Sequence, residues 1–181
     1  GWDNQPVTWI SLEDARVYAR WAGKRLPHEW GWQYAAQGPD GRLYPWGPEW
    51  DASRMPPQDH GHSLRAPADV NAHPSGASLL GVEDLTGNVW QWTTDWYQEH
   101  GEIAHACCTV ENPRGGAAET SFDPRQPNVK IPRKVTKGGS HLCAPNYCRR
   151  FRPAARMAQA VDTSITHLGF RCIVRPEAQA V

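Results

Sequence analysis

The chain has 181 residues, in which 19 Lys and Arg residues balance 19 Asp and Glu residues, so the formal net charge is zero. A length of this order is typical of one domain with one hydrophobic core, and we expect a single domain over residues 1–181. No basic excess favours nucleic acid or an anionic membrane, and no apolar run is long enough to cross a bilayer. The composition thus excludes partners recognised by bulk charge, so any partner must be recognised locally.

The ten tryptophans, all between Trp2 and Trp96, are the most unusual part of the composition. They occur with 16 Gly and 16 Pro in a chain of negative mean hydropathy, which is not typical of long amphipathic helices. Large aromatic side chains can build a core that contains few aliphatic residues. We therefore expect an α+β fold with little regular secondary structure.

The first helix is predicted directly after a short strand-like run at residues 6–10. Ser11 and Asp14 have the spacing of a capping box, in which each side chain accepts a hydrogen bond from the backbone N–H of the other residue. Apolar residues then recur at intervals of three and four, and Gly23 is suited to end the helix. The pattern predicts a helix over residues 12–22.

A second helix is expected from about residue 29 to residue 37, where a glycine follows. We expect Trp30, Tyr34 and Ala35 to face the core from this helix. Residues 39–78 show turn chemistry without a sustained period, and their aromatic residues predict ordered loops.

Three strands are expected in the second half of the chain. The segment 81–97 is typical of a turn that leads into a strand. A polar, Pro-rich insertion follows over residues 98–133, and short β-prone runs at 134–137 and 168–174 predict the other two strands.

The stretch from Lys137 to Arg150 concentrates reactive side chains. Four residues separate Cys143 from Cys148, so the backbone must bend between them if the two thiols act together. Pro145 and Asn146 favour such a bend. A structural disulfide, a redox pair, a soft-metal site and two unrelated buried cysteines are all compatible with this spacing.

Four arginines follow the cysteine pair at short intervals. They either pair with surface carboxylates, or lower the pKa of a thiol or grip an acidic or backbone-rich ligand. These residues are Arg149, Arg150, Arg152 and Arg156.

A second candidate site lies at the turn before the first predicted strand. Its side-chain and backbone oxygens suit the oxygen-only coordination that calcium accepts. The contributing residues are Asp84, Gly87, Val89 and Gln91. A capped turn without an ion is the alternative, and the residues alone favour it.

Five motifs resemble those of the formylglycine-generating enzyme, or sulfatase-modifying factor, family, and the resemblance covers nearly the whole chain. Four of them, together with the terminal Gly-Phe-Arg, are shared by binding proteins and iron-dependent sulfoxide synthases on the same scaffold. The cysteine pair within Gly-Gly-Ser-x-x-Cys-x-x-x-Tyr-Cys is specific to the aerobic enzyme. The motifs are Trp21 to Pro27, Tyr44-Pro45-Trp46-Gly47, Gly87 to Thr93, Gly138-Gly139-Ser140, and Leu168 to Cys172.

The resemblance implies a C-type-lectin-like fold and an enzyme that uses dioxygen to oxidise a sulfatase cysteine, within a Cys-x-Pro-x-Arg-like motif, to Cα-formylglycine. It implies that Cys143 and Cys148 bind Cu(I), a soft ion that suits thiolate ligands, and that the substrate cysteine adds a third sulfur. Ser140 and Tyr147 match active-site positions near the thiols, and Trp90 matches a pocket-lining aromatic residue. The expected partner is an unfolded or peptide segment of a sulfatase, bound by a monomer.

Several departures from the family pattern carry expectations of their own. The family's calcium site is implied at the turn described above, with Gln91 in place of the usual glutamate, so we expect weaker calcium affinity. Ala19, Ala36 and Pro153 stand where animal members have disulfide cysteines, which leaves Cys172 unpaired and suits the cytoplasm of a prokaryote. The chain begins about where the family's second third begins, so we expect the N-terminal portion to be missing or replaced.

Two other functions on the same scaffold compete with this one. A non-catalytic, lectin-like binding module would agree with a shortened N-terminus and weakened calcium ligands. An iron-dependent sulfoxide synthase relative would need a three-histidine site, but the eight histidines include no helical His-x-x-x-His pair. That third hypothesis also leaves the cysteine pair unexplained.

Overall fold

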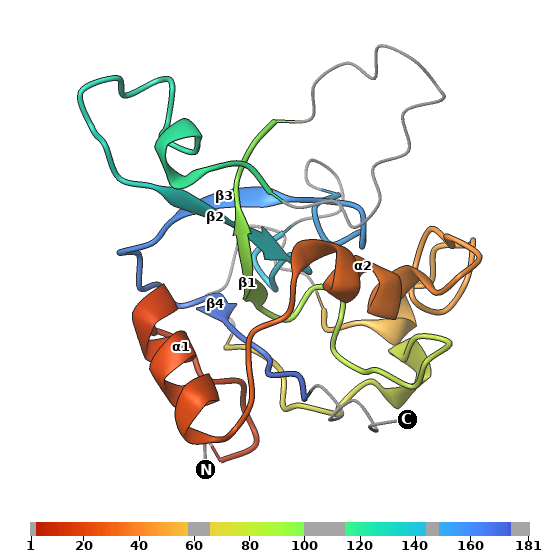
Figure 1. Ribbon diagram of the computed structural model, residues 1–181. Helices are drawn as coiled ribbons and strands as arrows, with labels where there is room; N and C mark the ends of the chain where they lie inside the picture. The colour runs from red at the N-terminus through yellow and green to blue at the C-terminus, as the bar shows by residue number, and fades with distance from the viewer. Residues whose placement is uncertain (1–2, 58–65, 100–114, 144–148, 175–181) are drawn as a thin grey trace, which may run out of the picture.

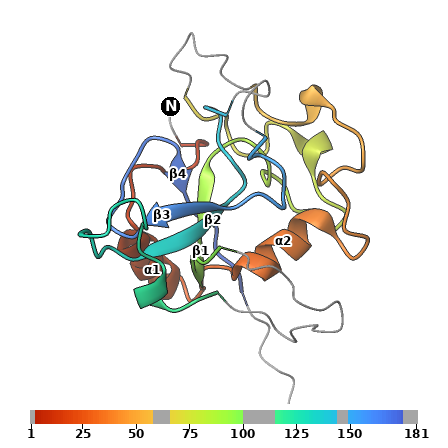
Figure 2. The same cartoon turned by 90° about the horizontal axis from the view of Figure 1, so that it is seen from above.

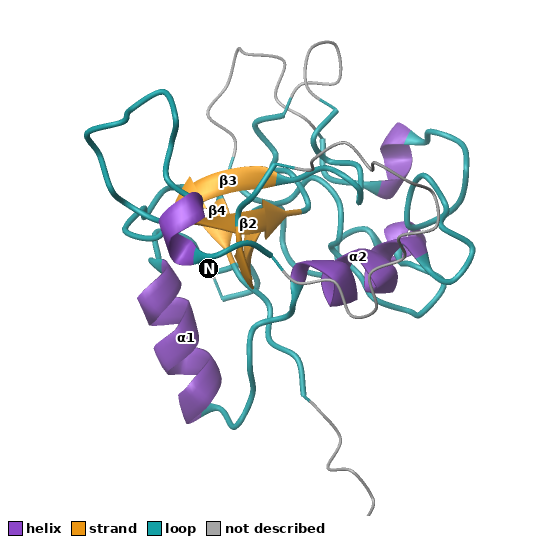
Figure 3. Ribbon diagram, turned by 45° about the horizontal axis from the view of Figure 1, so that its top comes forward, coloured by secondary structure: helices purple, strands orange, loops and turns teal. Residues whose placement is uncertain are grey.

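The structure, a computed structural model, describes residues 3–57, 66–99, 115–143 and 149–174. Loops make up most of it, as Figure 3 shows by colour. No helix within these ranges is long and apolar enough to cross a membrane. The regular elements are α1 (Leu12–Trp21), α2 (Glu29–Gln37), β1 (Trp90–Trp96), β2 (Arg133–Lys137), β3 (Met157–Ala160) and β4 (Leu168–Gly169), with short 3₁₀ turns at Ala52–Arg54, Pro74–Gly76 and Ala118–Thr120 (Figure 1).

The four strands form one sheet in the order β3-β2-β1-β4. β1 pairs antiparallel with β2, where Trp92 lies opposite Thr136, and parallel with β4, where Trp90 lies opposite Leu168. β3 adds an antiparallel edge to β2. The two helices lie on opposite sides of this small sheet (Figure 2), and most of β1 is buried.

α1 confirms the prediction of a capped helix. The N–H of Ser11 donates to Asp14 Oδ2 at 2.8 Å, and the N–H of Asp14 donates to Ser11 Oγ at 3.2 Å. Gly23 follows the helix with φ of 66°, a left-handed conformation that glycine adopts readily. The strand predicted at residues 6–10 is wrong, because Trp9 has φ of 57°, which interrupts an extended backbone.

α2 has the predicted bounds but presents another face to the core. Trp32 and Ala36 are buried, whereas Trp30 and Tyr34 are exposed by 36% and 55%. Trp32 donates its indole N–H to Gln91 Oε1 at 2.7 Å. The orientation of the helix is therefore tied to polar partners that lie far away in the sequence, which apolar spacing cannot reveal.

The strand predictions are confirmed at β1 and β2 and only partly at the third site. β4 has two residues, and Ile173 instead forms an isolated bridge with Arg25. β3 was not predicted, because its half-buried sequence Met-Ala-Gln-Ala lacks the β-branched and aromatic residues that mark strands.

The core joins α1 to β1 and to the loops that follow the sheet. Leu12, Ala15 and Ala19 pack in one cluster with Trp90 and Trp92. The prediction of an aromatic core is confirmed for the buried Trp32, Trp90 and Trp92, while Trp9 and Trp21 are largely exposed. Cys172 is a half-buried free thiol, as expected from the absence of partner cysteines.

Lys137 ends β2 with a fully buried side chain, whose Nζ donates to Gln33 Oε1 at 3.1 Å beneath α2. Burial lowers the pKa of Lys137 to about 8. Between that value and the ordinary lysine pKa of about 10.4, the unfolded chain binds more protons than the folded one, so the free energy of unfolding contributed by this group rises with pH. Below the folded-state pKa, Lys137 is charged in both states and the cost of its burial is constant.

We therefore predict that Lys137→Met changes the pH dependence of stability. Between pH ~7 and ~10, wild type should gain roughly 1–3 kcal/mol of unfolding free energy relative to the variant. Urea unfolding at several pH values measures this difference. Parallel stability curves for the two proteins would contradict the prediction.

Candidate functional site

Cys143 lies in the loop after β2 and is 4% exposed. Its N–H donates to the carbonyl of Ser140 at 3.0 Å, which closes a tight turn between the two residues. Within this turn Ser140 Oγ lies 4.0 Å from Cys143 Sγ and accepts from the N–H of Leu142 at 3.3 Å. The turn thus brings together a buried thiol and a buried hydroxyl, two of the predicted site residues. Tyr147 and Cys148 lie outside the described residues.

Two glycines give this loop its sharp entry. Gly138 and Gly139 have φ of 98° and 70°, values that side chains other than glycine rarely tolerate. A Cβ at Gly139 would stand 2.6 Å from the Cα of Phe151 and 2.8 Å from its backbone N. The segment after the cysteine pair therefore packs directly against the glycine pair, and only a residue without a side chain fits between them.

His141, which the sequence did not single out, fixes the same loop to the start of β1. Its backbone N–H donates to the carbonyl of Asn88 at 2.9 Å, and its ring Nδ1 lies 3.0 Å from the same oxygen. The side chain of Asn88 in turn donates to and accepts from the backbone of Ala68, at 3.1 and 3.0 Å. One asparagine therefore holds two loops, and its place in the Gly-Asn-Val-Trp motif is the sequence signal for this role.

Trp90, predicted to line a pocket, is 2% exposed and belongs to the same packed cluster as Cys143. Its backbone N–H donates to the carbonyl of His167 at 2.8 Å, which joins β1 to the loop before β4. Burial, followed by the charges of His141 and Arg150, lowers the pKa of His167. The loop at residues 138–143, called the thiol loop below, therefore lies in a region that also contains His141, His167 and Arg150.

Aromatic rings extend from the thiol loop toward the first half of the chain. Phe151 packs against Trp50 with ring centroids 4.8 Å apart, and Tyr44 stacks on Trp46 at 5.3 Å. Tyr44 also lies 5.4 Å from Trp50. A cavity of about 580 Å³ opens beside Trp46 and Trp50. The Tyr-Pro-Trp-Gly motif therefore supplies one wall near the candidate site.

Arg156 has a structural partner. Its guanidinium pairs with both carboxylate oxygens of Glu29, through Nε to Oε1 and through Nη2 to Oε2 at 3.0 Å, and Nη1 donates to the carbonyl of Gln98 at 2.8 Å. Both side chains of the ion pair are almost fully buried. The sequence left open whether the arginines pair with carboxylates or act on a thiol or ligand. Arg156 pairs with a carboxylate, and this pair lies inside the protein rather than on its surface.

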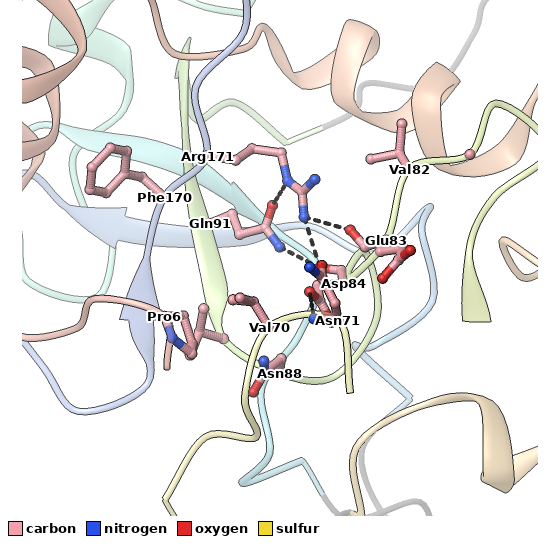
Figure 4. A pocket seen from close by; sticks show the side chains of 12 residues that line it. Pro6, Val70, Asn71, Val82, Glu83, Asp84, Asn88, Gln91, Phe170 and Arg171 are labelled. Carbon is pink, nitrogen blue, oxygen red and sulfur yellow. Dashed lines mark hydrogen bonds between the residues drawn. The ribbon is translucent and has the colours of Figure 1, made fainter. Parts of the chain in front are cut away.

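The oxygen-rich turn forms, and Figure 4 shows what occupies it. Gln91 Oε1 accepts from the indole N–H of Trp32 at 2.7 Å and from Arg171 Nε at 2.6 Å. Gln91 Nε2 donates to the carbonyl of Asp84 at 2.9 Å, and Arg171 Nη2 donates to the carbonyls of Glu83 and Asp84 at 2.9 and 3.0 Å. Of the predicted oxygens, Gln91 Oε1 and the carbonyl of Asp84 therefore accept from donors of this chain.

These contacts do not fit calcium. A carbonyl oxygen has two lone pairs, and both lone pairs of Gln91 Oε1 and of the Asp84 carbonyl already meet N–H donors. A guanidinium cation at the same point also repels a divalent cation. Across the described ranges, no group of three or more His, Cys, Asp or Glu side chains is arranged to hold a metal ion.

Comparison with known proteins places residues 1–176 on the family model described as "Sulfatase-modifying factor enzyme 1-like domain". The formylglycine-generating enzyme of Mycobacterium tuberculosis is 40% identical over 188 residues, covering 94% of this chain and 58% of that protein. "Inactive C-alpha-formylglycine-generating enzyme 2" of Bos taurus is 32% identical over 178 residues, covering 92% and 49%. The chain therefore spans about half the length of these curated relatives.

Two further comparisons widen the range of similar proteins. The hercynine oxygenase of Mycobacterium tuberculosis is 42% identical over 95 residues, which is 50% of this chain and 22% of that protein. Among solved structures, Treponema denticola variable protein 1 superposes with a TM-score of 0.71 at 18% identity, covering 96% of this chain and 72% of that one. The structural likeness confirms the expected fold, of the C-type-lectin-like and formylglycine-generating kind.

We predict that Gly139→Ala destabilises the protein far more than a matched glycine substitution. Gly81 has the same left-handed φ, 73°, but a Cβ there meets nothing within 4 Å. Gly81→Ala should cost about 1 kcal/mol of unfolding free energy from its backbone alone, and Gly139→Ala about 3 kcal/mol or more because the methyl group also strikes Phe151. Urea unfolding of both variants measures the difference, and equal losses would show that the packing against residue 151 does not constrain the loop.

Proposed function

Because this chain belongs to the sulfatase-modifying factor enzyme 1-like family, we propose that it is the catalytic portion of an oxidoreductase that converts a sulfatase cysteine to Cα-formylglycine. The observation that carries the proposal is the loop at Cys143. A buried thiol lies beside a buried hydroxyl there, in a turn shaped by the Gly138-Gly139 pair. The match to the mycobacterial formylglycine-generating enzyme over 94% of the chain supports the same activity.

The proposed substrate is a peptide segment of a sulfatase that carries a Cys-x-Pro-x-Arg-like motif. Conversion of its CH₂–SH group to an aldehyde with release of H₂S removes two electrons. Dioxygen accepts four electrons when one of its atoms enters the aldehyde and the other leaves as water. Two molecules of a thiol reductant must therefore supply the remaining two electrons and leave as a disulfide, which balances the reaction.

We propose copper as the cofactor because the two cysteines supply the kind of ligand that this metal prefers. Cys143 and Cys148 would hold Cu(I), because soft thiolates select this soft ion over the hard cations that carboxylates bind. When bound, the ion would supply activation of dioxygen next to the substrate thiol.

The residues around Cys143 would support this chemistry. The apolar packing around Cys143, which includes Trp90, would exclude water from the site. Ser140 Oγ is near enough to Cys143 Sγ to hydrogen-bond to the thiolate and so favour the deprotonated form. Tyr147 is proposed to help orient oxygen or substrate.

The cellular setting belongs to the same proposal. The free thiol of Cys172 agrees with a reducing compartment, and we propose a monomer in the cytoplasm of a prokaryote.

A non-catalytic binding module is the second candidate, and the bovine relative described as inactive favours it. An iron-dependent sulfoxide synthase is the third candidate, which the likeness to hercynine oxygenase over half of the chain favours. Within the described residues, the lack of a three-residue cluster of His, Cys, Asp or Glu counts against that iron enzyme. Neither alternative assigns a role to the thiol and hydroxyl at residues 143 and 140.

Turnover of a peptide separates these candidates. The chain, supplied with Cu(I), dioxygen and a thiol reductant, should form an aldehyde on a Cys-x-Pro-x-Arg peptide, detected by mass spectrometry and by a hydrazide probe. Cys143→Ser should lower the rate by about 10²-fold or more, because it removes a proposed ligand. Cys172→Ser is the control. It changes a free thiol that follows β4, and it should keep the rate. An unmodified peptide after incubation with folded, copper-loaded protein would contradict the proposal.

Copper affinity gives an independent prediction. Titration of the reduced protein with Cu(I) against a competing chelator should reach one equivalent, since a two-thiolate site holds one ion. Cys143→Ala should abolish this binding and Cys172→Ala should retain it. The same stoichiometry in wild type and in Cys143→Ala would place the copper elsewhere.

A further inference from the structure

We propose that the turn from Glu83 to Gln91 is closed by the guanidinium of Arg171 in place of a metal ion, so that this chain holds its candidate site without calcium. The inference concerns stability and does not depend on the proposed function. It rests on the hydrogen bonds within the turn, on the backbone of Asp84 and on the contacts between the turn and the thiol loop.

The side chain of Gln91 has only one orientation that satisfies its neighbours. Its Oε1 receives two N–H donors, from Trp32 and Arg171, and its Nε2 faces the carbonyl of Asp84. Rotation of the amide by half a turn would set three donors against one another and two acceptors together. The amide is therefore a fixed link between α2, the turn and the segment after β4.

The guanidinium of Arg171 contacts three oxygens of the turn, which belong to Glu83 and to two of the predicted calcium-binding residues, Asp84 and Gln91. It donates to Gln91 Oε1 and to the carbonyls of Glu83 and Asp84, at distances between 2.6 and 3.0 Å. Arginine stays protonated at neutral pH, so it provides a permanent positive charge at this point. Three oxygens from two segments thus share one internal cation (Figure 4).

The backbone of Asp84 is shaped for this contact. Its φ of 56° lies in the left-handed region, which aspartate adopts more readily than most residues because its short side chain can hydrogen-bond locally. Its carbonyl accepts from both Arg171 and Gln91, while its carboxylate Oδ2 accepts from the N–H of Asn71 at 3.0 Å. The carbonyl and the carboxylate Oδ2 of Asp84 therefore each accept from donors of this chain.

The turn also supports the thiol loop. The N–H of Gly87 donates to the carbonyl of Gly138 at 2.8 Å. A Cβ at Gly138 would lie 3.3 Å from the indole of Trp32 and 3.5 Å from Gln91 Nε2. Gln91, which Arg171 contacts, and Trp32, which donates to Gln91, are therefore the residues against which Gly138 packs.

The rival occupant is calcium in the adjacent cavity of about 520 Å³, which Glu83 and Asp84 line. Among the described residues, Glu83 Oε2 is buried there without a hydrogen-bond partner. Asp84 Oδ2 accepts from the N–H of Asn71, and calcium takes six to eight oxygens. Calcium at the turn would also have to displace the N–H donors and face the guanidinium charge.

Thermal unfolding of wild type with and without calcium tests the inference. CaCl₂ at about 5 mM exceeds the dissociation constants of weak calcium modules, so a real site would raise the melting temperature. We expect wild type in CaCl₂ and in EDTA to melt within about 1 °C of each other. A calcium-specific increase that EDTA reverses and Mg²⁺ does not reproduce would overturn the inference.

Variants test the role of the guanidinium itself. Arg171→Met should lower the melting temperature by about 5 °C or more, because it leaves buried oxygens without donors. Arg54→Met removes a part-exposed pair with Asp51 and an exposed hydrogen bond to the carbonyl of Ser75. It is the matched control and should change the melting temperature by about 2 °C or less. Equal losses in the two variants would contradict the proposed role of Arg171.

A gain-of-function variant completes the test. Gln91→Glu combined with Arg171→Met should melt at a higher temperature in calcium than in EDTA, since the turn then offers a carboxylate and carbonyls to the ion. A double variant that calcium does not stabilise would show that Arg171 does not stand in for an ion.

Discussion

The backbone hydrogen bonds between residues 87–88 and the loop after β2 are the constraint on which the candidate site depends. Gly87 donates to Gly138, and the carbonyl of Asn88 receives both the N–H and the ring nitrogen of His141. These contacts hold the turn of Ser140 and Cys143 at the start of β1, where Cys143 and Trp90 belong to one buried cluster. Residues 138–143 are thereby tied to the start of β1 by backbone hydrogen bonds.

Buried polar groups take over much of the organisation that regular structure provides in other folds. Arg156 joins the segment after the cysteine pair to Glu29 at the start of α2, and Arg171 joins the segment after β4 to the turn before β1. Asp95 in β1 accepts from the N–H of Glu29 at 2.7 Å. Such groups are costly to leave unpaired in the interior, so each one specifies a single arrangement of the loops that it connects.

The sequence predicted the elements that local physics determines and missed those that distant partners determine. The capping box at Ser11 and the bounds of α2 follow from neighbouring residues and are confirmed. The buried face of α2 was predicted wrongly because Trp32 is held by Gln91, and β3 was missed because its pairing with β2 alone makes it a strand. At the candidate site, motif resemblance selected Cys143 and Ser140, which lie together in one turn, while the positions of His141 and Arg171 depend on contacts between distant segments that no local pattern reveals.

The central claim is that the loop at Cys143 belongs to an oxygen-dependent enzyme that makes formylglycine. Its most direct test measures, in one reaction of the copper-loaded chain with a sulfatase-motif peptide and a thiol reductant, the dioxygen consumed, the aldehyde formed and the H₂S released. The account predicts equal amounts of all three and none of them under argon. Oxygen uptake without aldehyde, or aldehyde formed equally well without oxygen, would contradict it.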